Sequence, residues 1–342
     1  MTRDKFPEIC IVIPAYNRPE FLNELLESIA AQDVMPESVL VIEDCSPQRS
    51  QISALCAFWK EQFSSFGVNL IYVENQVNLG YDANVRRCLE LCEQRWAMLM
   101  GNDDLLLRNA ISEVQRYVCN GSVMMVSRSF LRFEDDISLP IGLSSLAKEN
   151  KVFHVEADDP KFLFRSSAFV GGLVFDAIEC KKIATSKYDG SLYYQVYLAA
   201  VAFCTTGIGY IAKPIVGGRT GNPPMFGSAN SEVGSHIPGS YTANSRGVMW
   251  AGVLMICADI GNQYKVDLTT SVRRELTVRQ SFHIFEMNAS ASKEELLRLR
   301  DMLRRNKLYG HWLPKLFFSI NYLFGNKSKL LYRSARSLLQ HS

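Results

Sequence analysis

Residues 9–29 read ICIVIPAYNRPEFLNELLESI: a short apolar run, a break, and then a segment with apolar residues at helical spacing. The run at 9–13 has the length and the β-branched content of a strand that is buried on both faces of a parallel sheet. Pro14 ends that run, and Pro19 stands where a helix is expected to begin. The stretch therefore predicts a buried strand, a turn and an amphipathic helix in succession.

The same alternation continues downstream. Apolar runs of strand length occur at 38–44, 69–75 and 96–101, and helical patterns fill intervals between them, one at 52–63 and one that ends at Leu91. Repeated alternation of strands and helices is typical of an open, doubly wound α/β sheet. We therefore predict an α/β fold, with a Rossmann-like, open mixed sheet flanked by helices and a C-terminal helical extension.

Polar residues gather where these predicted strands end. The clusters are Ala15–Asn17, Glu43–Ser46, Asn78–Gly80 and Asn102–Asp104. Ligands of open α/β sheets bind beyond the carboxyl ends of the strands. The coincidence of polar clusters with strand ends therefore predicts a ligand site at this edge of the sheet.

Two pairs of adjacent carboxylates are the most informative parts of these clusters. Asp103 and Asp104 follow an apolar strand, and their mutual repulsion is relieved if a hard divalent cation with open positions for phosphate oxygens binds there. The same residues equally suit a helix N-cap, because three leucines follow them. Glu43 and Asp44 leave a similar choice between hydrogen bonds to a base or ribose and a simple turn.

Composition narrows the classes of function. The 342 residues are 47% hydrophobic and carry a formal net charge of +2, which does not indicate a nucleic-acid-binding protein. The nine cysteines form no C-x-x-C pair, so we expect free thiols in a reducing cytoplasm. The uncharged stretch at 190–212 has about the length of a membrane span, but its Gly, Gln and Thr content favours a buried helix followed by a buried strand.

Four segments together resemble the successive signatures of family-2 glycosyltransferases, which have the GT-A fold. The segments are IVIPAYNRPEFLNELLESIAAQ (11–32), VIEDCSPQ (41–48), NLGYDANVRRCLE (78–90) and LMGNDD (99–104). They occur in the order and at the spacing of that family, and the resemblance extends over residues 8–220. The variants are most similar to those of the bacterial O-antigen type, the abequosyltransferase-like members.

The resemblance implies a nucleotide-diphosphate sugar donor, of UDP or CDP type, and a divalent metal ion, Mn²⁺ or Mg²⁺. The nucleotide-binding residues would be Pro14, Ala15, Tyr16, Arg18, Glu43, Asp44, Asn78, Gly80, Asn84, Arg86, Asn102 and Asp103. The metal ligands would be Asp104 and Asp103. Gly101 stands where the first Asp of the family's D-x-D-D form is common, which leaves the ribose contact of that Asp open.

The family's catalytic base is an Asp or Glu that precedes a helix well past the metal motif. By this resemblance Asp189 is the base, which takes the proton of the acceptor hydroxyl during attack, and Arg219 contacts the acceptor or a phosphate. The position of Asp189 ahead of a helix by itself favours an N-cap, and Asp176 and the Asp158–Asp159 pair are competing carboxylates. A base that acts opposite the leaving group implies inversion at the anomeric carbon.

The chain divides into a GT-A domain at 1–225, with a nucleotide-sugar half at 1–110 and an acceptor half at 111–225, and a loop plus helical region at 226–342. The stretch at 215–247 is rich in Gly, Pro, Ser and Asn, as functional lids and disordered links are. From residue 293 basic residues interleave with aromatic ones, which suits a helix on an anionic membrane surface. A helical cap on the domain or a dimer contact is the alternative for that tail.

These features together predict a cytoplasmic enzyme on the inner face of the membrane that glycosylates a glycan or polyprenyl-linked acceptor in O-antigen or capsule synthesis. A dinucleotide-dependent oxidoreductase or a P-loop enzyme does not fit, because PAYNRP stands where their glycine-rich motifs belong. A processive membrane synthase needs several membrane spans, which the sequence does not show. A non-catalytic sugar-nucleotide binder on the same fold stays an alternative, because the first Asp of the D-x-D-D form is missing.

Overall fold

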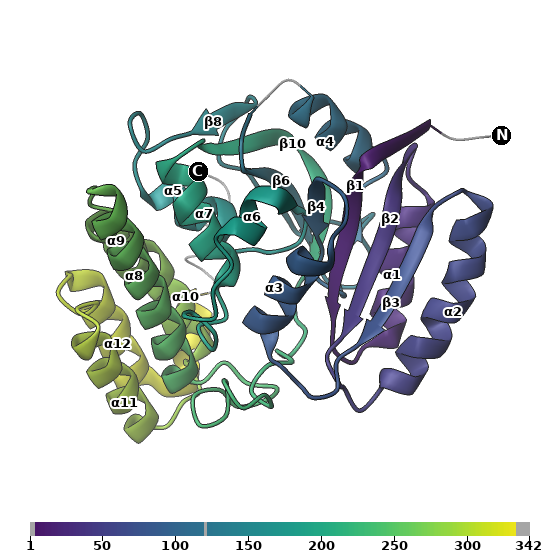
Figure 1. The fold of residues 1–342 in the computed structure, drawn as a ribbon. Coiled ribbons are helices and arrows are strands. Elements are labelled where there is room, and N and C mark those ends of the chain that lie inside the picture. Colours follow the sequence, from purple (N-terminus) through teal and green to yellow (C-terminus); the bar gives the residue numbers. More distant parts are fainter. Residues whose placement is uncertain (1–3, 120–121, 333–342) are drawn as a thin grey trace.

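The structure of the protein is a computed structural model that describes residues 4–119 and 122–332. One mixed sheet crosses the molecule, and helices cover both of its faces (Figure 1). The strand order is β3-β2-β1-β4-β9-β6-β10-β5, with β7 paired to β6 and β8 paired to β10. The C-terminal helices stand together at the side away from β3 (Figure 1). The predicted architecture, an open mixed sheet with flanking helices and a helical extension, is confirmed.

The amino-terminal half of the sheet is parallel. Its strands are β1 (Asp4–Ala15), β2 (Val34–Glu43), β3 (Asn69–Glu74) and β4 (Trp96–Leu99). The helices between them are α1 (Pro19–Ala30), α2 (Arg49–Ser65) and α3 (Tyr81–Leu91). α1 has Pro19 in its first turn, as expected, and its leucines and Ile29 are buried in one cluster with the residues of β1 and β2.

The order of these strands creates the edge at which the polar clusters meet. β1 lies between β2 and β4, and the register pairs Ala15 with Glu43 and Val12 with Leu99. Because the three strands run in the same direction, their carboxyl ends lie side by side. Residues that follow β1, β2 and β4 are therefore brought together although they are far apart in the chain.

The second half of the sheet mixes strand directions. β9 (Leu173–Asp176) runs antiparallel between β4 and β6 (Met125–Phe133), and β10 (Ile208–Arg219) runs parallel to β6. The short strands are β5 (Leu105–Leu106), β7 (Gly142–Ser144) and β8 (Lys151–Phe153), and the connecting helices are α4 (Ala110–Val118), α5 (Lys161–Ser167) and α6 (Ala177–Lys182). β5 pairs with the end of β10, which draws the turn after β4 against Arg219.

The uncharged stretch at 190–212 forms a buried helix and then a strand, as predicted. The helix is α7 (Tyr194–Cys204), and every residue from Tyr194 to Phe203 is buried. It packs against α5 and α8 and also contacts β6 and β10, which explains why it is apolar on all sides. No helix within the described ranges is both long and apolar enough to cross a membrane.

The chain beyond β10 begins with a long segment at 220–242 and continues as a group of helices. These are α8 (Ala243–Tyr264), α9 (Thr269–Glu275), a π-helical turn (Leu276–Gln280), α10 (Ser281–Met287), α11 (Lys293–Arg305), α12 (Trp312–Phe324) and a 3₁₀ turn (Gly325–Lys327). α11 starts with a capping box formed by Ser292 and Glu295. One continuous cluster of buried side chains joins Leu99 of β4, Val253 of α8 and Leu303 of α11, so these helices share the core of the sheet.

Candidate active site

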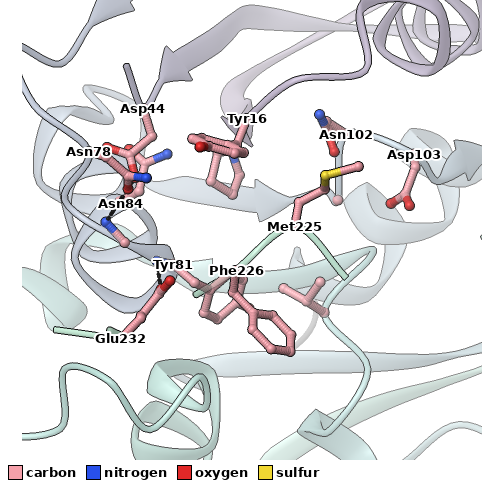
Figure 2. A pocket seen from close by; sticks show the side chains of 14 residues that line it. Tyr16, Asp44, Asn78, Tyr81, Asn84, Asn102, Asp103, Met225, Phe226 and Glu232 are labelled. Carbon is pink, nitrogen blue, oxygen red and sulfur yellow. Dashed lines mark hydrogen bonds between the residues drawn. The ribbon is translucent and has the colours of Figure 1, made fainter. Parts of the chain in front are cut away.

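A cavity of about 190 Å³ lies at the edge where β1, β2 and β4 end (Figure 2). It is lined by Pro14, Tyr16, Asp44, Asn78, Gly80, Tyr81, Asn84, Gly101, Asn102, Asp103, Val170, Met225, Phe226 and Glu232. All four polar clusters contribute to this lining. Of the residues predicted to bind nucleotide, four lie outside it: Ala15, Arg18, Glu43 and Arg86.

The acidic pair after β2 is divided between the cavity and the interior. Asp44 lines the cavity, and its carboxylate accepts hydrogen bonds from Leu79 N (2.8 Å), Gly80 N (2.9 Å) and the Asn75 side chain (2.7 Å). Glu43 is fully buried and does not line the cavity. Burial raises the pKa of both carboxyl groups. Asp44 is therefore the member of the pair that can meet a ligand.

The turn after β1 places a cation beside the cavity. Asn17 and Arg18 adopt left-handed backbone conformations, with φ of 56° and 60°, and the chain then enters α1. The Arg18 side chain reaches the carboxylate of Asp103 at 2.5 Å and the carbonyl oxygen of Pro223. Because a guanidinium can donate two parallel hydrogen bonds to phosphate oxygens, Arg18 stands where it can meet an anionic ligand held by the Asp103 turn.

Asp103 and Asp104 occupy different environments. Asp103 lines the cavity and is held by Arg18 and, at 3.3 Å, by the side-chain amide of Asn222. Asp104 is 3% exposed and accepts a hydrogen bond from Arg219 N at 3.1 Å. Burial, and then the neighbouring Asp103, raise the pKa of Asp104 well above its usual range. Of the predicted metal pair, Asp103 faces the cavity, and Asp104 lies behind it.

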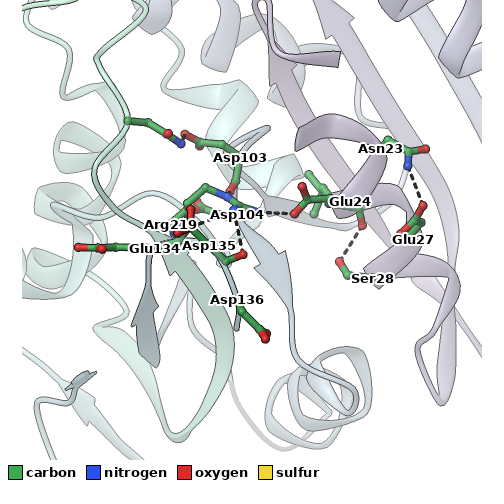
Figure 3. A network of polar contacts seen from close by, with 12 residues as sticks. Asn23, Glu24, Glu27, Ser28, Asp103, Asp104, Glu134, Asp135, Asp136 and Arg219 are labelled. Atoms are coloured by element: carbon green, nitrogen blue, oxygen red, sulfur yellow. Dashed lines mark hydrogen bonds and ion pairs between the residues drawn. The ribbon is translucent and has the colours of Figure 1, made fainter. Parts of the chain in front are cut away.

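Arg219 contacts the turn of Asp103 and Asp104, the acidic turn, on the side away from the cavity (Figure 3). Its guanidinium pairs with Glu24, donates to the carbonyl oxygen of Asp103 at 3.1 Å, and stacks over the rings of Phe21 (4.4 Å) and Phe133 (4.6 Å). Only 4% of the side chain is exposed. Arg219, which was predicted to contact an acceptor or phosphate, does not line the cavity, and the contacts it makes fix the backbone of Asp103.

The helix α3 forms one wall of the cavity with its first turn. Tyr81 and Asn84 line the cavity, and the Asn84 amide donates to the carbonyl oxygen of Ile42 at 3.1 Å. Arg86 lies outside the lining and binds both oxygens of Asp189, at 2.5 and 3.0 Å. The predicted base therefore lies against the flank of α3, in an ion pair and outside the cavity lining.

The competing carboxylates are also engaged elsewhere. Asp176 caps α6 and pairs with Arg95 at 3.1 Å. Asp158 and Asp159 pair with Lys151 and Lys161. None of these three acidic groups lines the cavity.

The segment at 220–242 adds residues that sequence reasoning did not single out. Glu232 is 2% exposed and lines the cavity, and its two oxygens accept hydrogen bonds from Tyr81 N (2.8 Å) and Gly227 N (2.6 Å). Met225 and Phe226 of the same segment also line the cavity (Figure 2). The Gly- and Pro-rich composition predicted a functional lid or a disordered link, but no local pattern indicated which of its residues reach α3.

Comparison with known proteins identifies the class to which this site belongs. A family model described as Glycosyl transferase family 2 matches residues 10–170. That range contains the second half of β1, all of β2 to β4 and all four polar clusters. Residues 10–170 therefore form a family 2 glycosyltransferase domain, and the sheet that carries the cavity is a GT-A fold.

Individual relatives agree with this assignment. Over 226 residues the chain is 26% identical to abequosyltransferase RfbV of Salmonella typhimurium, a match that covers 61% of this chain and 65% of that protein, less than two thirds of its length. S. aureus TarS 1-349 in complex with UDP-GlcNAc aligns with a TM-score of 0.56 at 15% identity, over 96% of this chain and 92% of that chain. Mannosyltransferase PcManGT from Pyrobaculum calidifontis, in complex with GDP-Man and Mn2+, aligns with a TM-score of 0.52 at 14% identity, over 93% and 87%. The two structures share the fold.

Proposed function

We propose that the chain is an inverting glycosyltransferase that moves a sugar from a UDP- or CDP-type donor to a hydroxyl of a glycan acceptor in bacterial surface polysaccharide synthesis. The observation that carries this proposal is the convergence of all four polar clusters on one cavity at the carboxyl edge of the sheet. The similarity to an abequosyltransferase supports an acceptor of the O-antigen type. The nucleotide sugars bound to the structural neighbours support a nucleotide-sugar donor.

The cavity offers a different group to each part of such a donor. The Tyr16 ring provides a flat apolar surface for a base. Asp44 has about four lone-pair directions, of which three are used by protein donors, so it can accept one more hydrogen bond from a ribose hydroxyl. Arg18 and the Asp103 turn stand together at the end suited to the diphosphate.

A divalent cation, Mn²⁺ or Mg²⁺, fits the acidic turn through oxygen ligands. The Asp103 carboxylate lines the cavity, and so does Asn102, whose amide nitrogen is already bound to the carbonyl oxygen of Asn17 at 3.0 Å. No group of three or more His, Cys, Asp or Glu within the described ranges forms a ready metal cage. The protein would thus supply one or two oxygens, as is common where phosphates and water complete the coordination. A bound cation would neutralise charge on the departing diphosphate.

The base that deprotonates the acceptor hydroxyl is assigned to Asp189, with Glu232 as its competitor. The Arg86–Asp189 pair has to open before Asp189 can accept a proton. Glu232 already lines the cavity, but both of its oxygens hold backbone N–H groups. Asp189→Asn and Glu232→Gln separate the two. The variant that loses kcat while keeping donor affinity identifies the base, and weakened donor affinity in Glu232→Gln would mark Glu232 as a positioning residue.

Two features of the C-terminal helices favour binding of the enzyme to the anionic inner face of the cytoplasmic membrane. α12 exposes 62% of Trp312, 74% of Leu323 and 53% of Phe324. A hollow between α11 and α12 is lined by four cations: Arg300, Arg304, Lys307 and Lys315. Exposed apolar groups beside cations suit an anionic lipid surface, where a polyprenyl-linked acceptor would reside. Residues 333–342 of the predicted tail lie outside the described residues.

Flotation with anionic liposomes tests the membrane contact. The variant Trp312→Ser/Leu323→Ser/Phe324→Ser removes the exposed apolar groups of α12, and we expect it to stay at the bottom of the gradient. Phe58→Ser/Leu139→Ser removes side chains of similar exposure, 54% and 73%, from other parts of the surface and should float like the unchanged protein. Flotation of the α12 variant would refute the contact.

The transfer itself is tested with purified protein, a panel of nucleotide-diphosphate sugars and an O-antigen-type acceptor. We expect one donor to be consumed with formation of a glycosylated acceptor, detected by mass spectrometry. The configuration of the new linkage, read by NMR, should be inverted relative to the donor. A retained configuration would contradict the single-base mechanism.

A non-catalytic nucleotide-sugar binder is the second candidate, and one observation favours it. Asp103 and Asp189, the two carboxylates proposed for catalysis, are both paired with arginines, Arg18 and Arg86. Slow hydrolysis of the donor without acceptor separates the candidates, because a binder that lacks catalysis leaves the donor intact. Donor binding without hydrolysis or transfer would favour the second candidate.

A further inference from the structure

A second cavity, of about 640 Å³, lies between the 237–244 stretch and the helices α10 and α11. Its walls combine two cations with apolar groups. Arg298 and Arg305 line it from α11, and Met287, Met302 and Ile237 provide the apolar part. No predicted site residue takes part in this cavity.

The two arginines have no ion-pair partner among the described residues. They stand seven residues apart, which is close to two helical turns and therefore places them on one face of α11. Among the residues that the structure describes, neither forms an ion pair or a hydrogen bond. Glu295 also lines the cavity, but it accepts a hydrogen bond from Ser292 N in the capping box, at 2.8 Å. By contrast, Arg304 of the same helix lies within 3.9 Å of Asp301.

The start of α8 faces the same cavity. Thr242 caps this 22-residue helix by accepting a hydrogen bond from Ser245 N. The N–H groups of Ala243 and Asn244, which also line the cavity, have no acceptor in the described part of the chain. Unsatisfied N–H groups and the positive end of a long helix favour an anion, and here they add to the two guanidinium groups.

An aromatic contact joins the lining of this cavity to that of the donor cavity. Phe226 lines the donor cavity, Tyr241 lines the second one, and their rings meet edge to face with centroids 5.3 Å apart. The segment at 220–242 thus borders both cavities. A molecule with an anionic group in the second cavity can extend past Tyr241 and Phe226 toward the site where the sugar is transferred.

We propose that the second cavity binds a phosphate or diphosphate group of the acceptor, and this rests on the proposed function for the acceptor's identity. The arginines and the α8 N-terminus hold the anionic oxygens. The methionines and Ile237 accommodate hydrocarbon attached to the phosphate. Both a lipid-borne and a soluble phosphate share this chemistry, and the choice of probe distinguishes them.

The test titrates the full chain, in buffer with EDTA and without donor, with inorganic pyrophosphate, farnesyl diphosphate and farnesol. We expect both diphosphates to bind and farnesol not to bind. Arg298→Gln/Arg305→Gln should weaken binding by about tenfold or more, because each lost guanidinium removes a charge-assisted hydrogen bond. Arg116→Gln/Arg279→Gln is the matched control, since it removes two charges from exposed arginines that line neither cavity, and it should change affinity less than about twofold.

The probes also identify the source of the phosphate. Tighter binding of farnesyl diphosphate than of pyrophosphate indicates a lipid-linked acceptor, and equal binding indicates a phosphate carried by a soluble glycan. Absence of diphosphate binding, unchanged binding by Arg298→Gln/Arg305→Gln, or equal weakening by Arg116→Gln/Arg279→Gln would overturn the proposal. This test contains neither donor nor metal, so its result does not depend on the proposed function. If the diphosphates bind here but no nucleotide binds in a separate titration, the proposed function fails and the anion site remains.

Discussion

Asp44 holds the turn before α3 and faces the donor cavity at the same time. Asp44→Asn keeps the shape of the side chain but loses its charge and one acceptor oxygen. We expect nucleotide affinity to fall by about tenfold or more, as for loss of a hydrogen bond to a charged group. Glu43→Gln is the matched control, because Glu43 is adjacent and fully buried but outside the lining. Calorimetric titration of both variants should show the loss in Asp44→Asn alone; equal affinities would contradict the role of Asp44.

Gly80 shows how closely the 220–242 segment approaches the donor cavity. Its φ is 87°, and a Cβ atom there would lie 2.8 Å from Glu232 Oε1 and 2.9 Å from Ala229 Cβ. Gly80→Ala therefore adds a steric conflict to backbone strain. At Gly67, with φ of 71°, an added Cβ meets nothing within 4 Å, so Gly67→Ala introduces an alanine at positive φ without a steric conflict.

We expect Gly80→Ala to lower the free energy of unfolding by about 1–3 kcal/mol more than Gly67→Ala does, because overpacking of a tight contact has that magnitude. Urea denaturation of both variants measures the difference. If the two substitutions cost the same, the segment does not lie against Gly80 as described.

At the scale of elements, α3 connects the donor cavity to α7. Its first turn lines the cavity, and the buried carboxylate of Asp82 accepts hydrogen bonds from Leu192 N (2.8 Å) and Tyr194 N (2.9 Å), where α7 begins. The base candidate Asp189 lies just before that point, paired with Arg86 of α3. The position of Asp189 relative to the cavity is therefore set by two contacts to one helix.

Asp82 gives this connection a dependence on pH. Burial raises its pKa to about 7, whereas in the unfolded chain it titrates near 4. Between these values the native state retains a proton that the unfolded state has lost, so stability falls as pH rises through this window. The side chain of Asp82→Asn is uncharged at every pH, so the variant lacks this pH dependence of stability.

We therefore expect the unchanged protein to lose stability relative to Asp82→Asn as pH rises from about 4 to about 7. The unfolding free energy of the unchanged protein minus that of the variant should decrease across this range. Urea denaturation at intervals across that range measures it, and groups common to both proteins cancel in the difference. Two parallel stability curves would show that Asp82 does not carry a raised pKa in the native state.

The strands and their polar ends could be predicted because they depend on local patterns. The buried run at 9–13 and the proline that follows it specify a strand and its end without reference to the rest of the chain. The divergence of Asp103 and Asp104 could not be predicted in this way. It arises because β5 pairs with Val216 and Gly217 of β10, and this pairing places Asp104 under Arg219.

Contacts between residues that are far apart in the chain could not be predicted from the sequence either. Glu232 and Tyr81 are 151 residues apart in the chain, and the sequence around Glu232 has no motif that indicates a partner. The same holds for Arg86 and Asp189. Motif reasoning found the residues at the strand ends, and tertiary packing decided which of them face the cavity.

At the scale of the whole molecule, the C-terminal helices are part of the same core as the sheet. Leu296, Leu299 and Leu303 of α11 are almost fully buried, and α11 packs on α8, which packs on α7. The helices therefore support the 220–242 segment, which borders both cavities. A helical region of this kind contributes to folding as well as to any membrane contact.

Removal of residues 293–342 should consequently destabilise the whole chain. We expect the thermal midpoint to fall by about 5 °C or more, since each buried leucine that is lost costs about 2 kcal/mol or more. The Trp312→Ser/Leu323→Ser/Phe324→Ser variant, which alters exposed side chains, is the control and should keep its midpoint. A truncated protein with an unchanged midpoint would mean that the helices fold separately from the sheet.

The most direct test of the donor site is a calorimetric titration of the full chain with UDP, CDP, GDP and dTDP, with and without Mn²⁺, repeated with Asp103→Asn. We predict that one nucleotide binds tightly only when the metal is present and that the substitution abolishes this dependence, because Asp103 is the carboxylate of the acidic turn that faces the cavity. Absence of nucleotide binding under every condition would contradict the assignment of the cavity as a donor site.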